Sequence, residues 1–468
     1  MLTNTQKESI GVKFVLEKLD CHSPYGVELL RRIAPFGVGA ADELCRCFDN
    51  IDKALSLPSQ DFFALCGHLA HFLNIRGIAG KCESQTLNEV ELFEVKSFLL
   101  AYSGLMDSLH KSKFTLEGVN FPDLTNALDI LDPKRLRIAP FSIENNFSNK
   151  LAEIRQQKAR VEASIGKLGL TEELLKERAA IVACEDDEEI RIMEALTKKI
   201  REHAPALRSA MDSVGEMDLT LAKARLAKDY SATRPKISAS CIMFKEMSNP
   251  YMEEALAETG KDFKKVSIKL QKGATVITGA NMGGKSVAIK TAALNTFLCQ
   301  MGFFVFASEA EIPLLDDICI IAEEEKSNFM SSFGSEMSRM NEIIPRLKNE
   351  RLLIALDEPA RGTNPAEGYA IVRAIVSFLS EFDSFSVIAT HYDKTIPPGV
   401  AHYQTAGLSA DAIRRLNSDR GKTEIHDLID YNLVQVEPSA PVPKDALNIC
   451  RIIGLDGALL EKIEGFMP

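Results

Sequence analysis

The sequence predicts a helical region followed by an α/β domain whose sheet is mostly parallel. Upstream of about residue 240, apolar residues recur at helical spacing, and Gly and Pro are rare. Downstream, short continuous apolar runs are typical of buried parallel strands. With 468 residues, of which 46% are hydrophobic, the chain can bury more than one core. We expect a helical core over residues 1–145, two long helices with a short coiled coil over 146–235, and the α/β domain over 236–468.

Five stretches of the first part have the spacing of amphipathic helices. They are residues 25–34, 61–73, 87–109, 149–165 and 188–229. We interpret the segment between the last two, together with the acidic residues up to Glu189, as a solvated helix turn with an acidic tip. It holds Lys167, Lys176 and Arg178 against Glu172, Glu173, Glu177, Glu185, Asp186, Asp187, Glu188 and Glu189. Such a tip would repel the phosphates of a nucleic acid.

A glycine-rich loop lies near the start of the α/β domain. Residues 279–286 read Gly-Ala-Asn-Met-Gly-Gly-Lys-Ser. The apolar run 274–278 precedes the loop, and the helix-like stretch 287–297 follows it. This order of strand, loop, Lys-Ser and helix favours a nucleotide site over a turn that binds nothing.

The residue types of this loop suit phosphate binding. Backbone N–H groups of Gly279, Gly283 and Gly284 can surround phosphates, and the helix N-terminus favours their negative charge. Lys285 can reach the β and γ oxygens of a nucleotide, and Ser286 can hold Mg²⁺.

An acidic pair follows a second apolar run, residues 352–356. Asp357 and Glu358 would be costly at the end of a buried strand unless they served a metal or a reaction. We predict that Asp357 holds Mg²⁺ together with Ser286, and that Glu358 polarises the attacking water. Alone, such a pair is typical of a helix N-cap, but beside the phosphate loop it favours catalysis.

A third apolar run, residues 386–390, ends at His391. Alone, this histidine would be a satisfied loop residue. Because the strand ends of an open α/β sheet meet at the ligand crevice, we predict that His391 senses the γ-phosphate.

Together these motifs resemble the ATPase domain of the MutS proteins, which are relatives of the ABC-type ATPases. The resemblance rests on residues 278–286, on Ser331-Ser-Phe-Gly-Ser-Glu-Met337, on residues 357–368, which begin Asp-Glu-Pro-Ala-Arg-Gly, and on Ala389-Thr-His-Tyr392. A weaker similarity to MutS-like core helices, especially those of the branch not devoted to mismatch recognition, covers residues 87–98, 147–155 and 217–225. It therefore spans most of the chain from about residue 20 onward.

The resemblance implies ATP and Mg²⁺ as cofactors and adds three site residues. Ser331 would begin the stretch that reaches across a dimer and stabilises γ-phosphate charge in trans, with a helix N-cap as the alternative. Asn281 resembles the family's phosphate-contacting Asn. Phe263 stands where these ATPases often carry an aromatic that stacks on adenine, although a core position beside Val266 is the alternative. A homodimer or a paralogous heterodimer with composite sites is implied.

Departures from the family pattern concern DNA. We expect the mismatch-recognition and connector domains to be missing, because the chain begins almost at the lever-like helices. Phe244-Lys-Glu246 matches the family's Phe-x-Glu wedge, but it lies just ahead of the phosphate loop and is interpreted as structural. Only residues 166–187 stand where the family inserts a DNA-gripping clamp. Ser248-Asn249-Pro250 replaces the family's Arg-His-Pro.

Two functions beyond ATP hydrolysis stay open. One is a DNA-structure-binding ATPase, as in mismatch repair or branched-DNA binding. The other is a protein-remodelling ATPase, such as a reactivating factor for an aminomutase, which acts without DNA. A structural dimer that binds ATP without turnover is disfavoured by Glu358, since degenerate ATPases commonly lose this carboxylate.

Composition indicates a cytoplasmic protein. No apolar stretch approaches the length of a membrane span, and the N-terminus lacks the apolar segment of a signal peptide. The ten cysteines are scattered, which suits thiols in a reducing compartment rather than a disulfide framework. A net charge of −11 gives no global attraction to nucleic acid, although a local basic groove can exist on an acidic protein.

Overall fold

The computed structural model describes residues 2–279, 283–322, 332–392, 395–408, 429–441 and 446–466. The chain forms two compact units. The sheet unit comprises Met1–Leu19, Ala34–Phe48 and Arg225–Pro468, and the helical unit comprises Asp20–Ile33 and Asp49–Ala224. Among the described residues, no helix combines the length and the apolar character needed to cross a membrane.

The helical unit contains the predicted helices and several short ones. Its helices are α3 (Pro24–Arg32), α5 (Ser59–Leu69), α6 (Arg76–Lys81), α7 (Glu89–Ser112), α8 (Thr125–Leu131), η1 (Asn145–Phe147), α9 (Asn149–Leu168) and α10 (Glu172–Arg201). Helices α4 (Ala41–Leu55) and α11 (Ala204–Asp229) cross the boundary between the units. The predictions for residues 25–34, 61–73, 87–109 and 149–165 are confirmed, with ends shifted by a few residues.

The predicted single helix over residues 188–229 is wrong, because α10 ends at Arg201 and α11 begins at Ala204. Pro205 is the second residue of α11, where its missing N–H costs nothing. In a continuous helix, its ring would clash with the carbonyl of residue 201. The proline therefore splits the segment.

Aromatic side chains form the centre of the helical unit. The ring of Phe98 on α7 lies 5.9 Å from Tyr25 and 5.3 Å from Phe72 in edge-on geometry. The Tyr25 hydroxyl donates to the Leu73 carbonyl at 2.8 Å and accepts the Ile75 N–H at 3.1 Å. This buried tyrosine is thus satisfied as both donor and acceptor.

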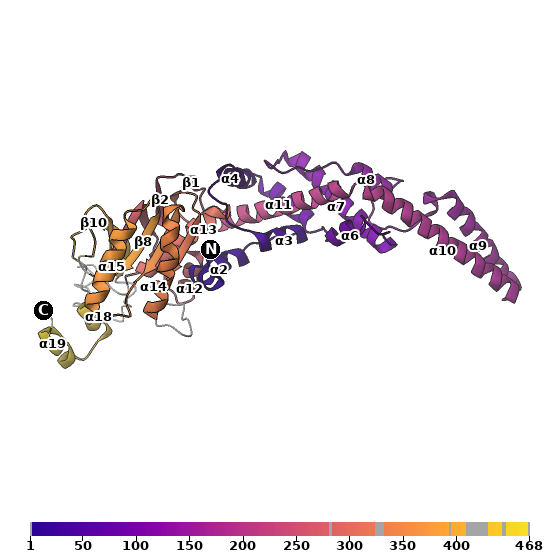
Figure 1. The fold of residues 1–468 in the computed structure, drawn as a ribbon. Helices are drawn as coiled ribbons and strands as arrows, with labels where there is room; N and C mark the ends of the chain where they lie inside the picture. Colours follow the sequence, from indigo (N-terminus) through magenta and orange to yellow (C-terminus); the bar gives the residue numbers. More distant parts are fainter. Residues whose placement is uncertain are drawn as a thin grey trace. The chain divides into compact units, whose positions relative to one another are not determined.

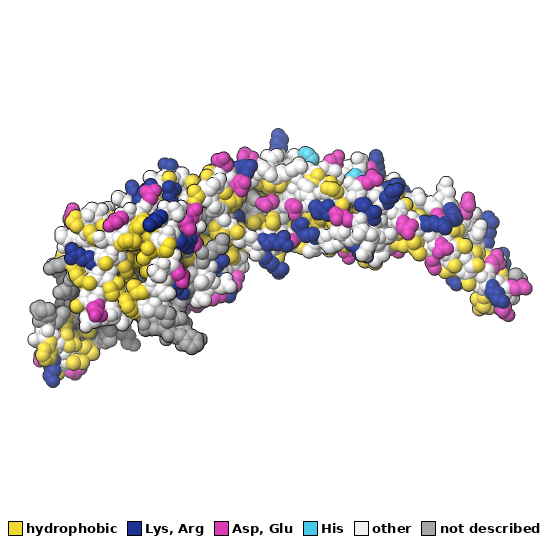
Figure 2. Space-filling view, viewed as in Figure 1, with side chains coloured by type: hydrophobic (Ala, Val, Ile, Leu, Met, Phe, Trp, Pro, Cys, Tyr) yellow, Lys and Arg dark blue, Asp and Glu magenta, His cyan; other side chains and the backbone are white. Residues whose placement is uncertain are grey.

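Helices α9 and α10 form an antiparallel hairpin (Figure 1). Arg155 of α9 contacts Glu185 at 2.8 Å and Glu189 at 2.7 Å, and Lys150 contacts Glu188 at 2.9 Å. The expected solvated acidic tip is confirmed only in part. Glu172 and Glu173, at the start of α10 beside the turn, are exposed, whereas Glu185 and Glu188 lie further along α10, buried and paired with bases of α9. Figure 2 shows acidic and basic side chains interspersed over the hairpin.

The sheet unit is built on a six-stranded sheet in the order β10-β9-β4-β8-β7-β6. The strands are β4 (Gly273–Thr278), β6 (Asp317–Ile321), β7 (Leu352–Asp357), β8 (Phe385–Thr390), β9 (Ala401–Leu408) and β10 (Ile429–Val436). Only the pairing of β10 with β9 is antiparallel. The mostly parallel sheet and the three predicted strands β4, β7 and β8 are confirmed.

Helices cover this sheet (Figure 1). They are α13 (Lys285–Gln300), α14 (Ser332–Ile343) and α15 (Pro365–Leu379). Apolar residues of α14 and α15, among them Met340 and Val376, form one buried cluster with alternate residues of β4 and β7. Helix α13 contacts β7 and β8 and contributes nothing to that cluster. Its first residue therefore stands beside the carboxyl ends of these strands.

A second sheet has the order β1-β5-β2-β3. Its strands are β1 (Lys236–Ile237), β2 (Cys241–Met247), β3 (Val266–Gln271) and β5 (Glu309–Ile312). Phe244 lies on β2, fully buried and paired with Ile268. The structural interpretation of this Phe is confirmed.

The remaining elements also belong to the sheet unit. They are α1 (Asn4–Ile10), α2 (Val12–Glu17), α12 (Pro250–Ala257), η2 (Ile344–Lys348), α18 (Ala446–Ile453) and α19 (Gly457–Phe466). The Gln6 side chain donates to the Ile320 carbonyl of β6 at 2.9 Å, and Asn249 donates to the Ile10 carbonyl at 3.1 Å. The first helices therefore pack against parts of the sheet unit that come much later in the sequence.

Gly26 of α3 provides a test of packing in the helical unit. A methyl group at this position would overlap the carboxylate of Asp218, which is fully buried and accepts N–H groups from His22 at 3.0 Å and Ser23 at 2.6 Å. We expect Gly26→Ala to lower the free energy of unfolding by about 2 kcal/mol, because neither backbone nor carboxylate can move away cheaply. Urea denaturation measures this change.

The matched control is Gly67→Ala on α5, where an added methyl meets open space. It should leave the free energy of unfolding unchanged or raise it by up to about 1 kcal/mol. Equal stability of the two variants would show that Asp218 does not constrain α3.

Candidate functional site

The site lies where three neighbouring parallel strands end. Strand β8 lies between β4 and β7, and its last residue, Thr390, pairs with Thr278 of β4. On its other side Ala389 pairs with Asp357. Parallel strands present their carboxyl ends at one edge of the sheet, so the segments that follow all three strands meet there.

The glycine-rich loop leads from β4 into α13. Gly284 is the N-cap of α13 with a φ of 80°, a left-handed conformation that suits glycine. An added methyl at Gly284 would also meet the ring of Tyr431 at 2.8 Å. The helix N-terminus at Lys285 presents backbone N–H groups and a partial positive charge to the same space. These features fit the binding of phosphate.

Lys285 is buried at the floor of the site. Its Nζ donates to the Gly279 carbonyl at 2.9 Å and lies 3.4 Å from Oε1 of Glu358. Burial lowers the pKa of Lys285, and the negative charge of Glu358 partly opposes this effect. The ion pair keeps a cation in a place from which solvent is largely excluded.

Ser286 and Asp357 form a direct pair. The Ser286 hydroxyl donates to Oδ1 of Asp357 at 2.8 Å. Burial raises the pKa of Asp357, and the Ser286 hydrogen bond opposes it. Among the described residues, no group of three or more His, Cys, Asp or Glu side chains could hold a metal by itself. Mg²⁺ usually takes one or two protein oxygens together with phosphate oxygens and water, so this pair fits it.

Glu358 follows β7 with a φ of 51°. Its Oε2 lies 3.4 Å from Nη1 of Arg361 and 4.0 Å from Nδ1 of His391. Neither Oε2 of Glu358 nor Nδ1 of His391 has a hydrogen-bond partner in the part of the chain that the structure describes. Both atoms are buried, so each lacks a partner that a bound ligand or water molecule would supply.

A buried histidine supports the start of the loop from β9. His402 Nε2 lies 2.7 Å from the Thr278 hydroxyl, and its Nδ1 lies 2.9 Å from the Glu437 carbonyl. Burial lowers the pKa of His402, although the bond to Glu437 opposes this effect. The imidazole thus links Thr278, the residue that precedes Gly279, to the Glu437 carbonyl.

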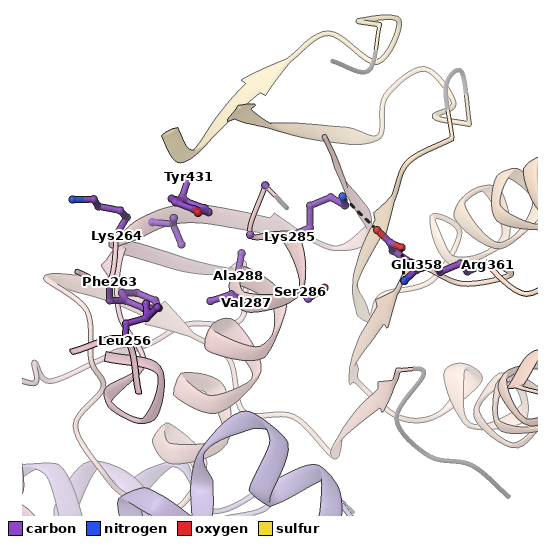
Figure 3. A pocket seen from close by; sticks show the side chains of 13 residues that line it. Leu256, Phe263, Lys264, Lys285, Ser286, Val287, Ala288, Glu358, Arg361 and Tyr431 are labelled. Atoms are coloured by element: carbon purple, nitrogen blue, oxygen red, sulfur yellow. Dashed lines mark ion pairs between the residues drawn. The ribbon is translucent and has the colours of Figure 1, made fainter. Parts of the chain in front are cut away.

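Lys285, Ser286, Glu358 and Arg361 border a cavity of about 460 Å³. Figure 3 shows Leu256 and Phe263 at one end, Glu358 and Arg361 at the other, and Lys285 between them. Tyr431 of β10 lies over the cavity (Figure 3). The volume of the cavity and its apolar end suit a molecule of nucleotide size.

The structure brings most of the predicted site residues together. Gly283, Gly284, Lys285, Ser286, Glu358 and Phe263 line the cavity, Asp357 bonds to Ser286, and Gly279 accepts from Lys285. His391 does not line the cavity, and its Nδ1 lies 4.0 Å from Oε2 of Glu358. Asn281 and Ser331 lie outside the described residues.

Sequence reasoning missed Tyr431 and Arg361. Tyr431 comes from a strand far beyond the last motif, and a single tyrosine in an alternating strand carries no signal of a pocket. Arg361 stands three residues after Glu358, within the stretch that carries the resemblance, so its position was a usable signal.

Comparison with known proteins identifies the family. Residues 275–414 match the family model described as MutS domain V. The chain carries a domain of the MutS family over these residues. The chain is 27% identical over 433 residues to an endonuclease MutS2 of Caldicellulosiruptor bescii. The aligned region covers 87% of this chain and 51% of that protein.

Relatives named for mismatch repair match a smaller share of the chain. It is 29% identical over 275 residues to a DNA mismatch repair protein MutS of Thermus thermophilus, covering 58% of this chain and 31% of that protein. A MutS of Haloquadratum walsbyi is 36% identical over 190 residues, covering 40% of this chain and 20% of that protein. The chain thus spans about half the length of the MutS2 relative and less of the MutS proteins.

The raised pKa of Asp357 has a consequence for stability. A carboxyl whose folded-state pKa is raised destabilises the fold at pH values where it is ionised, and this cost vanishes below the unfolded pKa of about 3.9. We therefore expect Asp357→Asn, whose amide oxygen can still accept from Ser286, to raise the melting temperature by a few degrees near pH 8 in EDTA.

This advantage should shrink as the pH falls toward about 4, which thermal unfolding over a pH series would measure. The control Asp187→Asn removes an exposed carboxylate of α10 and should show no such trend. A melting temperature of Asp357→Asn below that of the wild type at pH 8 would contradict the burial argument.

Proposed function

We propose that the chain binds ATP with Mg²⁺ in the cavity at the carboxyl ends of β4 and β7 and hydrolyses it there. The supporting observation is the convergence of Lys285, the Ser286–Asp357 pair and Glu358 on one cavity, from segments far apart in the sequence. The MutS-family domain supports the same activity.

Each residue of the site has a role in this proposal. Lys285 and the first N–H groups of α13 bind the phosphates, and Ser286 and Asp357 hold Mg²⁺. The bound Mg²⁺ supplies positive charge that offsets the charge developing on the phosphates. Glu358 orients the attacking water and accepts its proton through Oε2, which has no hydrogen-bond partner in the described structure. We assign the role of γ-phosphate sensor to His391, whose Nδ1 lies 4.0 Å from that oxygen.

The apolar end of the cavity takes the base. Phe263 offers an aromatic face there, and Tyr431 offers a second one. Aromatic side chains stack on a planar base with little dependence on its identity. Asn281 completes the proposal as a phosphate ligand, and Ser331 as a group that one subunit of a homodimer or heterodimer supplies to the site of the other. For both residues the family resemblance is the support. We propose that the protein acts in the cytoplasm.

DNA is the first candidate for the molecule on which the ATPase acts, because the relatives are named for endonuclease activity and DNA mismatch repair. A protein client is the second candidate, and the α9–α10 hairpin favours it. Arg155, Lys158 and Lys150 are engaged by acidic residues of α10. Arg178 is paired with Glu162 at 3.1 Å. Phosphates would have to displace these carboxylates, so the hairpin is a poor DNA grip.

The catalytic assignment predicts different defects for two variants. Lys285→Ala should abolish tight ATP binding, because it removes the buried cation. Glu358→Gln should keep ATP binding but slow hydrolysis by about a hundredfold or more, because an amide cannot accept the proton. Binding of a fluorescent ATP analogue and release of phosphate measure the two steps.

The control is Glu350→Gln, which changes a carboxylate near the opposite end of β7 that pairs with Arg346. It should bind and hydrolyse ATP as the wild type does. Hydrolysis by Glu358→Gln at the wild-type rate would remove the support for a role of Glu358.

The hairpin provides a test between DNA and protein clients. Replacing residues 163–177 by a short Gly-containing turn keeps the pair of Glu162 with Arg178 and all deeper ion pairs. We expect this variant to bind linear and branched duplexes as weakly as the intact chain, with and without ATP. The removed segment has only Lys167 and Lys176 as basic residues, and Lys176 pairs with Glu172.

Fluorescence anisotropy at several salt concentrations measures the affinity. A gripping clamp would show tight binding that the replacement destroys, with log K falling by about 0.9 per phosphate contact against log salt. That outcome would contradict the proposal for the hairpin and favour a DNA clamp.

A further inference from the structure

The loop that carries Glu358 has a strained backbone. Glu358 and Ala360 have φ values of 51° and 61°, in the left-handed region that residues with a Cβ rarely adopt. Such a conformation is unfavourable for a residue with a Cβ and persists only where its surroundings hold it. Because the φ of Glu358 sets the direction of its side chain, whatever holds this loop also sets the position of the carboxylate.

Two hydrogen bonds hold the loop from opposite sides. On one side the Glu358 N–H donates to the Ala389 carbonyl of β8 at 3.1 Å. On the other side the Ala360 N–H donates to Oε2 of Glu336 at 3.0 Å. Glu336 is 7% exposed and Ala360 is fully buried, so solvent does not compete for this second bond.

Glu336 is a side chain of α14, and its helix is fixed in the core. Met340 and Ile343 of α14 belong to the same buried cluster as Ala360, and Phe333 and Met337 pack against it. A carboxylate on a helix anchored in this way is held in place, so it defines where the Ala360 N–H must lie. The bond therefore connects the first turns of α14 to the residue two positions after Glu358.

We propose that Glu336 is a positioning residue for ATP hydrolysis, which holds the Glu358–Ala360 loop in its left-handed conformation and so places the Glu358 carboxylate. The inference rests on the proposed function of Glu358. A carboxylate with a purely structural role would change stability alone, whereas a positioning residue changes kcat while ATP binding is retained.

The test compares substitutions that differ in acceptor. Glu336→Gln keeps an oxygen acceptor at the same reach, whereas Glu336→Met keeps the volume and removes it. Loss of this buried hydrogen bond leaves the Ala360 N–H without an acceptor and the loop less firmly held. We therefore expect kcat of Glu336→Met to fall about tenfold, with the KM and the equilibrium affinity for ATP within about twofold of the wild type. Glu336→Gln should keep kcat within about threefold.

The control is Glu342→Met, an exposed position on the same helix, with wild-type kinetics expected. If Glu336→Met does not fold, Glu336→Asp replaces it, since its carboxylate is one methylene short of Ala360. Its kcat should then fall well below that of Glu336→Gln.

The inference is overturned if Glu336→Met or Glu336→Asp has the wild-type kcat while the separate variant Glu358→Gln is inactive. The proposed function would then stay intact. Full activity of Glu358→Gln would instead refute the proposed function. The two failures are thus distinguished by the Glu358 variant measured in the same assay.

Discussion

The parallel pairing of β4, β8 and β7 is the constraint on which the site depends. All three strands are mostly apolar and buried along nearly their whole length, and their charged residues come only at or after the last position. The pairing places Thr278 beside Thr390 and Asp357 beside Ala389. A shift in this pairing would separate the phosphate loop from the acidic pair, so the order of the strands determines the chemistry.

Sequence patterns predicted this centre because continuous apolar runs can be recognised without knowledge of their neighbours. They failed where structure depends on a distant partner. Pro205 split a segment that apolar spacing alone joined. The acidic run of α10 was expected at a tip, because its partners on α9 are known only once the hairpin forms. Spacing alone gave no reason to join the first helices to the sheet unit.

The candidate site shows the same division. Lys285, Ser286, Asp357 and Glu358 were named from local motifs, and the structure places them within one constellation, although their roles stay predictions. Tyr431 and Glu336 act on that constellation from β10 and α14, and their directions are set by tertiary packing. A sequence motif thus identifies the side chains closest to the chemistry. The side chains that orient them can be identified only from the three-dimensional structure.

The contact between Gln6 and β6 affects how the sheet unit can be isolated. Strand β6 is an edge of the six-stranded sheet, and the Gln6 side chain occupies the carbonyl of Ile320 on that strand. Unpaired edge groups are templates on which a strand of another molecule can add. A fragment that starts at β1 would lose this cover, together with the packing of α1 on α13. Self-association of such a fragment would then reflect an uncovered edge rather than a native dimer.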